Sequence, residues 1–101
     1  MVKLVGLYGH PTSPSDFEAY YADSHDPLVD KIPGLKRKEY ARATGAPGGG
    51  EPAYYRIVEL YFDNQQDLET GVNSPEGQAV VRDLSNFATG GVTIFIAEVD
   101  E

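Results

Sequence analysis

Two segments of this chain alternate like β-strands and carry apolar residues on both faces, which limits the folds open to it. Successive side chains of a strand point to opposite faces of its sheet. The first segment, residues 2–8, has Val2, Leu4 and Tyr8 on one face and Val5 and Leu7 on the other. The second, residues 54–62, has Tyr55, Ile57 and Tyr61 on one face and Val58, Leu60 and Phe62 on the other. A sheet built from such strands must be covered on both faces.

Helix start signals occur after each of these strands. Ser13 is a typical N-cap and Pro14 suits the first helical position, so a helix is predicted over residues 14–25. Ser74 and Pro75 repeat the signal for a second helix. The other predicted elements are a polar edge strand at 35–44, a short helix near 65–70 and a last strand at 92–99.

The predicted elements follow the order β-α-β-β-α-β, which is the ferredoxin-like arrangement of the α+β class. A chain of 101 residues is expected to form one domain, residues 1–101. Right-handed crossovers place the first and third strands at the centre of the sheet and both helices on one face. The other face then has no cover from this chain. We therefore expect a homodimer packed sheet to sheet.

The charge balance argues against several classes of partner. Sixteen acidic and 8 basic residues give a net charge of −8, which repels nucleic acid and anionic membrane surfaces. No apolar run approaches the roughly 20 residues that span a bilayer. The chain has no cysteine, which excludes disulfides, thiolate catalysis and Cys-ligated metals, and a cytoplasmic location is expected.

Residues 17–35, FEAYYADSHDPLVDKIPGL, contain most of the candidate chemistry. Their spacing predicts a helix with five residues on one face, namely Phe17, Tyr20, Tyr21, Ser24 and Leu28. Asp26 precedes Pro27, and proline disfavours helical dihedral angles in the residue before it. The helix is therefore expected to stop at Asp26, with His25 in its last turn.

The order of residues in this stretch resembles the EthD family, which is named for ethyl tert-butyl ether degradation. The matching positions are Tyr21, His25, Pro27, Leu28, Lys31, Pro33, Gly34 and Leu35. Two later stretches, residues 58–63 and residues 74–77 followed by Asp83 and Phe87, are similar to the family's third strand and second helical region. The resemblance implies a dimeric α+β barrel and a pocket between sheet and helices for a small apolar or aromatic ligand, with no cofactor.

His25 is the first candidate for acid–base chemistry, because only histidine has an unperturbed pKa near neutral pH, about 6.5. A helix C-terminus and the neighbouring Asp26 would both favour its charged form. Tyr21 precedes His25 by four residues, so the two lie on one helical surface. We predict that His25 and Tyr21 are catalytic residues. The alternative is that His25 caps helix carbonyls or fills a gap and that Tyr21 only packs in the core.

Three further residues are predicted to contact the ligand, namely Tyr20, Leu28 and Glu59. Glu59 interrupts an apolar strand face between Ile57 and Tyr61. Ionised carboxylates are rarely buried without a partner. Glu59 therefore either pairs with a Lys or Arg of an adjacent strand or of a partner chain, or it belongs to the pocket.

The sequence contains no recognisable metal or cofactor motif. His10 and His25 are the only histidines, and no HxH, HxxxH or HExxH spacing occurs, so we expect neither metal nor cofactor. Two functions stay open. One is a cofactor-independent acid–base catalyst of the isomerase, cyclase or decarboxylase type, which the family resemblance implies. The other is a non-catalytic binding or accessory protein of an oxidative degradation pathway.

Overall fold

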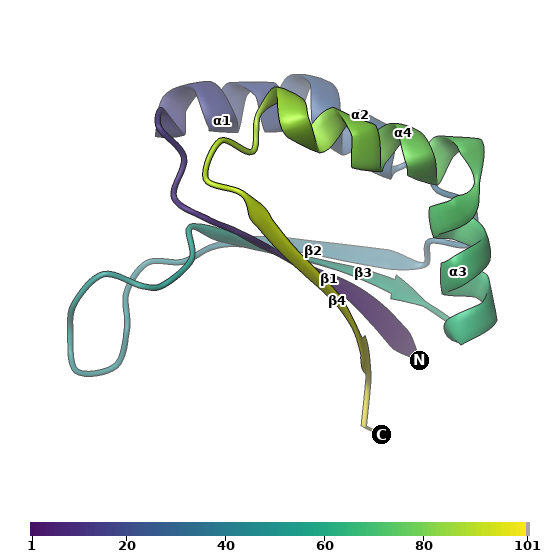
Figure 1. The fold of residues 1–101 in the computed structure, drawn as a ribbon. Coiled ribbons are helices and arrows are strands. Elements are labelled where there is room, and N and C mark those ends of the chain that lie inside the picture. The colour runs from purple at the N-terminus through teal and green to yellow at the C-terminus, as the bar shows by residue number, and fades with distance from the viewer. Residues whose placement is uncertain (101) are drawn as a thin grey trace.

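The computed structural model describes residues 1–100. A four-stranded sheet carries all the helices on one face and leaves its other face open (Figure 1). The elements in chain order are β1 (Val2–Tyr8), α1 (Pro14–Tyr20), the π-helical turn η1 (Tyr21–His25), α2 (Asp26–Val29), β2 (Arg37–Arg42), β3 (Arg56–Phe62), α3 (Gln65–Asn73), α4 (Pro75–Asp83), the 3₁₀ turn η2 (Leu84–Asn86) and β4 (Val92–Glu98). Within residues 1–100, no helix is long and apolar enough to cross a membrane.

The strand order β2-β3-β1-β4 confirms the ferredoxin-like arrangement predicted from the sequence. β1 and β3 are central, and every neighbouring pair of strands is antiparallel. The polar strand β2 lies at one edge, as predicted, and β4 lies at the other. β2 and β3 are both shorter than predicted, and residues 44–54 form a projecting loop (Figure 1). The last contact before the loop is a hydrogen bond from the Ala43 N–H to the Tyr55 carbonyl at 2.9 Å. Four glycines and two prolines between residues 45 and 52 explain the loop, since neither residue type sustains a ladder.

The core lies between the helices and the covered face of the sheet, and it is rich in aromatic rings. Tyr8 of β1, Phe17 of α1 and Phe62 of β3 are each 2% exposed or less. Phe17 meets Tyr8 edge-to-face, with ring centroids 5.2 Å apart. Burial of each such side chain contributes roughly 1.5–3 kcal/mol to stability. These rings fix the distance between the first helix and the sheet.

The two predicted helix starts are confirmed. The Ser13 hydroxyl accepts a hydrogen bond from the Asp16 backbone N–H at 3.4 Å. The Ser74 hydroxyl accepts one from the Gly77 N–H at 3.0 Å. Each cap satisfies a backbone donor that the helix itself cannot, which typically contributes about 1 kcal/mol.

The expectation that the first helix stops at Asp26 is wrong. Asp26 keeps helical dihedral angles (φ −58°, ψ −41°), and its N–H donates to the carbonyl of Tyr21, five residues earlier. A proline in an uninterrupted α-helix clashes with the carbonyl four residues before it. The extra residue of the π turn relieves that crowding ahead of Pro27, so the helical path continues into α2.

The π turn also changes which residues face the sheet. Phe17, Tyr21, His25 and Val29, spaced four apart, are all 2–3% exposed. Ser24 is exposed and Leu28 is only half-buried, so the prediction that they lie on one helical face with Phe17 and Tyr21 is wrong. A wider turn accounts for the shift, because it replaces the 3.6-residue period of an α-helix by a longer local one.

Close backbone packing joins α3 to α4. The short helix predicted near residues 65–70 continues through Gly71 to Asn73. A Cβ placed on Gly71 would lie 2.5 Å from the carbonyl oxygen of Pro33. A Cβ placed on Gly77 would lie 2.3 Å from the carbonyl oxygen of Gly71. Both glycines are therefore required by contact with backbone rather than by chain flexibility.

We expect Gly77→Ala to lower the free energy of unfolding by about 1–3 kcal/mol, as overpacking does. In an unobstructed helix the same change would raise it by up to about 1 kcal/mol, so the sign of the change tests the contact. Gly45→Ala is the matched control, since a Cβ placed on Gly45 would have no atom within 4 Å. Urea unfolding of the two variants measures the difference; a Gly77→Ala protein as stable as the control would contradict the packing.

Candidate functional site

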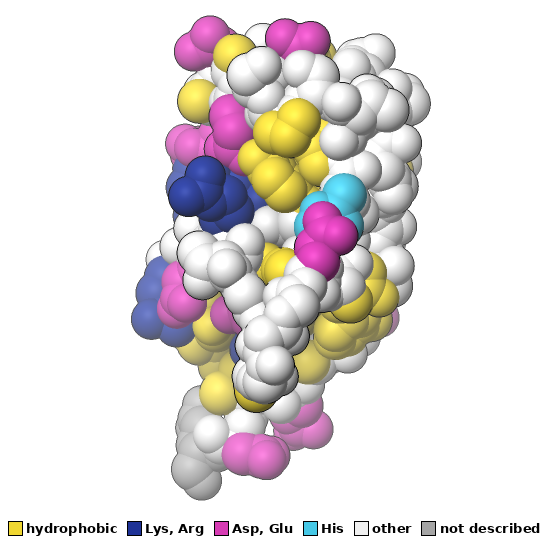
Figure 2. Space-filling model, turned by 90° about the vertical axis from the view of Figure 1, so that its left-hand side faces the viewer, with side chains coloured by type: hydrophobic (Ala, Val, Ile, Leu, Met, Phe, Trp, Pro, Cys, Tyr) yellow, Lys and Arg dark blue, Asp and Glu magenta, His cyan; other side chains and the backbone are white. Residues whose placement is uncertain are grey.

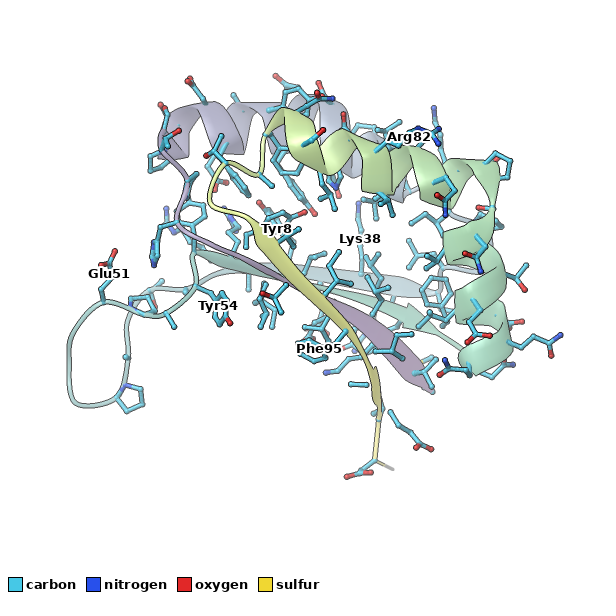
Figure 3. All side chains as sticks on the ribbon, viewed as in Figure 1. Tyr8, Lys38, Glu51, Tyr54, Arg82 and Phe95 are labelled. Carbon is cyan, nitrogen blue, oxygen red and sulfur yellow. The ribbon has the colours of Figure 1, made fainter. Side chains whose placement is uncertain are left out.

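A cavity of about 110 Å³ lies between the helices and the covered face of the sheet. Most of its wall is aliphatic, including Leu4, Val58, Leu60, Val72, Val80 and Leu84. The polar side chains in the wall are His25, Tyr8 and Tyr21. Tyr8 rises from β1 into the space under the helices (Figure 3). The site is thus an apolar chamber with a small number of hydrogen-bonding groups, as is common for small-molecule pockets.

His25 is held against the cavity by the last residue of α4. Its Nδ1 lies 2.8 Å from Oδ2 of Asp83, and the side chain is 2% exposed. An ionised carboxylate can only accept hydrogen bonds, so Nδ1 carries the proton and donates. Nε2 is then the basic nitrogen of the ring.

Burial lowers the pKa of His25 below its usual value. It outweighs the hydrogen bond to Asp83 and the negative charges of Asp83 and Asp26, which act in the opposite direction. Asp26 thus acts in the direction expected from the sequence. The expectation that the helix end would favour the charged imidazolium is therefore wrong. It fails because the chain does not end its helix there and because the ring is buried. His25 is a neutral base at neutral pH.

Asp83 is the residue that the sequence did not single out for a role in the site. Besides His25, it accepts from the Tyr20 hydroxyl at 2.6 Å and from the Asn86 amide at 3.0 Å. Burial acts to raise the pKa of Asp83, but these three hydrogen bonds together outweigh it and lower that pKa. No local spacing predicts the contact, since Asp83 and His25 are 58 residues apart.

Tyr21 stands beside His25, with ring centroids 5.3 Å apart. It stacks on Tyr40 of β2 at 3.8 Å and an interplanar angle of 3°. Its side chain is 3% exposed, and its hydroxyl has no hydrogen-bond partner among residues 1–100. Burial raises the pKa of Tyr21, so the group remains a protonated donor.

The other predicted ligand-binding residues lie elsewhere. Tyr20 is outside the cavity and reaches the site through the hydrogen bond from its hydroxyl to Asp83. Leu28 lies in a shallow surface depression beside Ala79 of α4. Glu59 is on the open face of the sheet, where it pairs with Lys3 of β1 at 3.4 Å and accepts from the Tyr61 hydroxyl at 2.9 Å. The structure therefore brings His25 and Tyr21 together but not Leu28 or Glu59.

The alternative for Glu59 that the sequence left open, pairing with a cation on an adjacent strand, is the one found. Val29 and Ile32 line the cavity where Leu28 was expected, which follows from the π turn. Within residues 1–100, no group of three or more His, Asp or Glu side chains is arranged to hold a metal ion.

Comparison with known proteins agrees with the sequence pattern. The sequence model of the EthD domain matches residues 9–91. The chain belongs to the EthD family. An uncharacterised 11.0 kDa protein of Rhodococcus erythropolis, encoded in the thcB–thcC intergenic region, is 35% identical to this EthD domain over 97% of the chain and 94% of its own length. The crystal structure of an EthD family protein from Bacillus halodurans is 36% identical, with a TM-score of 0.93 and 99% of each chain covered.

Two more distant structures share the fold of this EthD domain. A dimeric ferredoxin-like protein of Thermobifida fusca has a TM-score of 0.72 at 15% identity, covering 97% of this chain and 90% of its own. SnoaB, a cofactor-independent oxygenase of Streptomyces nogalater, has a TM-score of 0.72 at 12% identity, and the match covers 99% of this chain and 93% of SnoaB. At these identities the likeness establishes the fold alone.

The lowered pKa of His25 predicts how the stability of this EthD domain depends on pH. As pH falls through about 6.5, the unfolded chain binds a proton at this histidine before the folded protein does. The stabilisation is complete above about 6.5 and is lost as pH falls toward the folded pKa, with a slope of at most about 1.4 kcal/mol per pH unit for one proton. The pKa values of Asp83 and Glu18 are lowered, so the effects of these two carboxyl groups on stability appear at more acidic pH.

Thermal melting between pH 7 and pH 5 should therefore show a falling Tm that is smaller or absent in His25→Asn. His10→Asn is the control, because His10 is exposed on the loop side of the molecule and its loss should leave the wild-type pH profile in place. Parallel profiles for the wild-type protein and His25→Asn would contradict a buried neutral imidazole.

Proposed function

We propose that the cavity binds a small organic molecule and that His25 acts on it as a general base, without a cofactor. The observation that carries this proposal is a neutral imidazole in the wall of an apolar cavity, with Nδ1 hydrogen-bonded to Asp83 at 2.8 Å. An imidazole must be unprotonated, and so neutral, before it can accept a proton, and one with a pKa at or below the working pH meets that requirement.

The chemistry follows from the tautomer. Nε2 of His25 takes a proton from the bound molecule, and the imidazolium that forms is stabilised through Nδ1–H by Asp83. Tyr21, protonated and close to the ring, is available to donate to developing negative charge. Return of the proton at another atom of the molecule gives an isomerase-type reaction. Attack of the carbanion on a second carbonyl carbon of the same molecule, with the proton passing from the imidazolium to the new alkoxide, gives a cyclase-type reaction. A placed base contributes typically 10²–10⁴-fold to either.

A non-catalytic binding or accessory role is the second candidate. The cavity wall is aliphatic except for three side chains, and burial of an apolar ligand there would be favourable whether or not chemistry follows. SnoaB is a cofactor-independent oxygenase on the same fold, which supports the catalytic candidate only as a precedent for the architecture.

The open face of the sheet supports assembly into a homodimer. Phe95 of β4 is 45% exposed and points away from the helices (Figure 3). Leu7 and Ile57 are half-buried on the same face. Hydrophobic side chains reach the surface along the lower part of the molecule in Figure 2, below the helix layer. Exposed apolar patches of this kind mark association surfaces, and the Thermobifida fusca structure is that of a dimer.

Proton transfer can be tested by deuterium exchange. In D₂O, the wild-type protein is expected to accelerate exchange at the carbon next to the carbonyl group in at least one member of a panel of small ketones and lactones. His25→Asn should lose on the order of 10²-fold or more of that rate. Asp83→Asn should lose part of it, and His10→Asn should lose none. Binding without any catalysed exchange would favour the accessory role.

The dimer can be tested by sedimentation. The wild-type protein should sediment at about twice the 11.0 kDa chain mass, because an apolar sheet face left open to water is unfavourable. Phe95→Glu places a carboxylate on that face and should shift the protein to the monomer. Val81→Glu is the control, since Val81 is 46% exposed on the helix side. A wild-type monomer at micromolar concentration would overturn the homodimer.

A further inference from the structure

The Tyr21 hydroxyl is a buried donor that has no hydrogen-bond partner among residues 1–100. Buried polar groups in proteins nearly always have such a partner, and an exception that borders a cavity points to a partner that the chain itself does not supply. Tyr21 is only 3% exposed, and it lines the cavity. Phenylalanine would fill the same space without burying a hydroxyl.

The ring of Tyr21 is fixed in place by its surroundings. Tyr40 stacks on it face to face, and the guanidinium of Arg56 lies 4.2 Å from the centroid of the Tyr40 ring. Arg56 is in turn held by Glu18, to which its Nε donates at 2.9 Å. Tyr21 cannot turn away to find another acceptor without breaking this stack. The donor is therefore positioned before any ligand arrives, which lowers the entropic cost of binding.

The charges around the cavity are already neutralised. None of the residues that line it is Lys, Arg, Asp or Glu, and His25 is neutral. Lys38 lies on the same face of the sheet but is bound by Asp26 and Asp30, both at 2.6 Å. A ligand carboxylate would be buried without a counter-charge, which is strongly unfavourable.

The two ends of the cavity differ. Tyr21 stacks against β2, at one edge of the sheet, whereas Ile94 of β4 lies at the opposite edge. Ile94 and Val81 both line the cavity and are 45% and 46% exposed, so the chamber meets solvent between α4 and β4. A ligand entering there keeps its apolar part at the mouth and presents its deepest atoms to Tyr21 and His25.

We propose that this site, given the proposed function, selects a neutral molecule with an acceptor oxygen, and that the Tyr21 hydroxyl is the specificity-determining donor to that oxygen. The buried part of the molecule is compact, because the cavity of about 110 Å³ is smaller than the roughly 150 Å³ cavity that holds benzene in an engineered protein. Neutral cyclic ketones and lactones fit this description; carboxylates and plain hydrocarbons do not.

Three probes of similar size separate these classes. Cyclopentanone has the acceptor oxygen, methylenecyclopentane replaces that oxygen by CH₂, and cyclobutanecarboxylate carries a charge. NMR titration of the wild-type protein at pH 7.5 should give a Kd for cyclopentanone at least about tenfold lower than for methylenecyclopentane, as expected for one buried hydrogen bond. The carboxylate should bind most weakly of the three.

Tyr21→Phe and Tyr40→Phe form a matched pair. Each removes a buried hydroxyl without a partner among residues 1–100, so neither should lower the Tm of the free protein. Tyr40 does not line the cavity, and its variant should keep the preference for cyclopentanone. Tyr21→Phe should lose that preference, with the two Kd values falling within about twofold of each other.

Retention of the preference in Tyr21→Phe, equal binding of the carboxylate, or failure of cyclopentanone to bind would each overturn the inference. Its failure is distinguishable from failure of the proposed function. Deuterium exchange that depends on His25, with binding indifferent to Tyr21, keeps the catalytic proposal and removes this one. Binding that depends on Tyr21, without catalysed deuterium exchange, keeps this inference and removes the catalytic proposal.

Discussion

The hydrogen bond between His25 and Asp83 is the contact on which the rest of the site depends. It joins the π turn after α1 to the last residue of α4 across 58 residues of sequence, and so fixes the two helical segments that roof the cavity. The same bond chooses the tautomer of the imidazole. Phe87 also packs against the His25 imidazole, with ring centroids 4.5 Å apart. Packing and chemistry are therefore set by one interaction, in a place from which water is largely excluded.

The fold was predictable because its determinants are local. Alternation in residues 2–8 and 54–62 defines both sheet faces. Ser13 and Ser74 start the two helices at the predicted positions, and the handedness of the crossovers then leaves few topologies. His25 and Tyr21 could be placed side by side for a similar reason, since they are four residues apart on one helix. The polar composition of β2 likewise identified it as an edge strand.

What the sequence could not show depends on tertiary context. The preference against helical angles before proline is statistical, and at Asp26 it is overcome by a π turn that the surrounding core stabilises. Because the π turn contains one added residue, Val29 rather than Leu28 faces the cavity. Asp83 was visible only as a position similar to the family's, because a contact over 58 residues leaves no spacing to read. The charge state of His25 was mispredicted for the same reason: burial is a property of the whole fold.

The two faces of the sheet divide the chemistry of the molecule between them. The open face holds Glu59 with Lys3 and Glu39 with Arg37, so its charges are paired at a surface that is otherwise apolar. On the covered face the residues that line the cavity are neutral, and the charges nearest to them are paired. Asp83 accepts from three donors, and Asp26 and Asp30 bind Lys38. A chain with a net charge of −8 thus keeps its charge away from the place where a ligand would be buried. In such an environment an added charge is strongly disfavoured, whereas a neutral base and a buried hydroxyl donor are both free to interact with a neutral ligand. The burial that lowers the pKa of His25 therefore also restricts the ligands that His25 can meet.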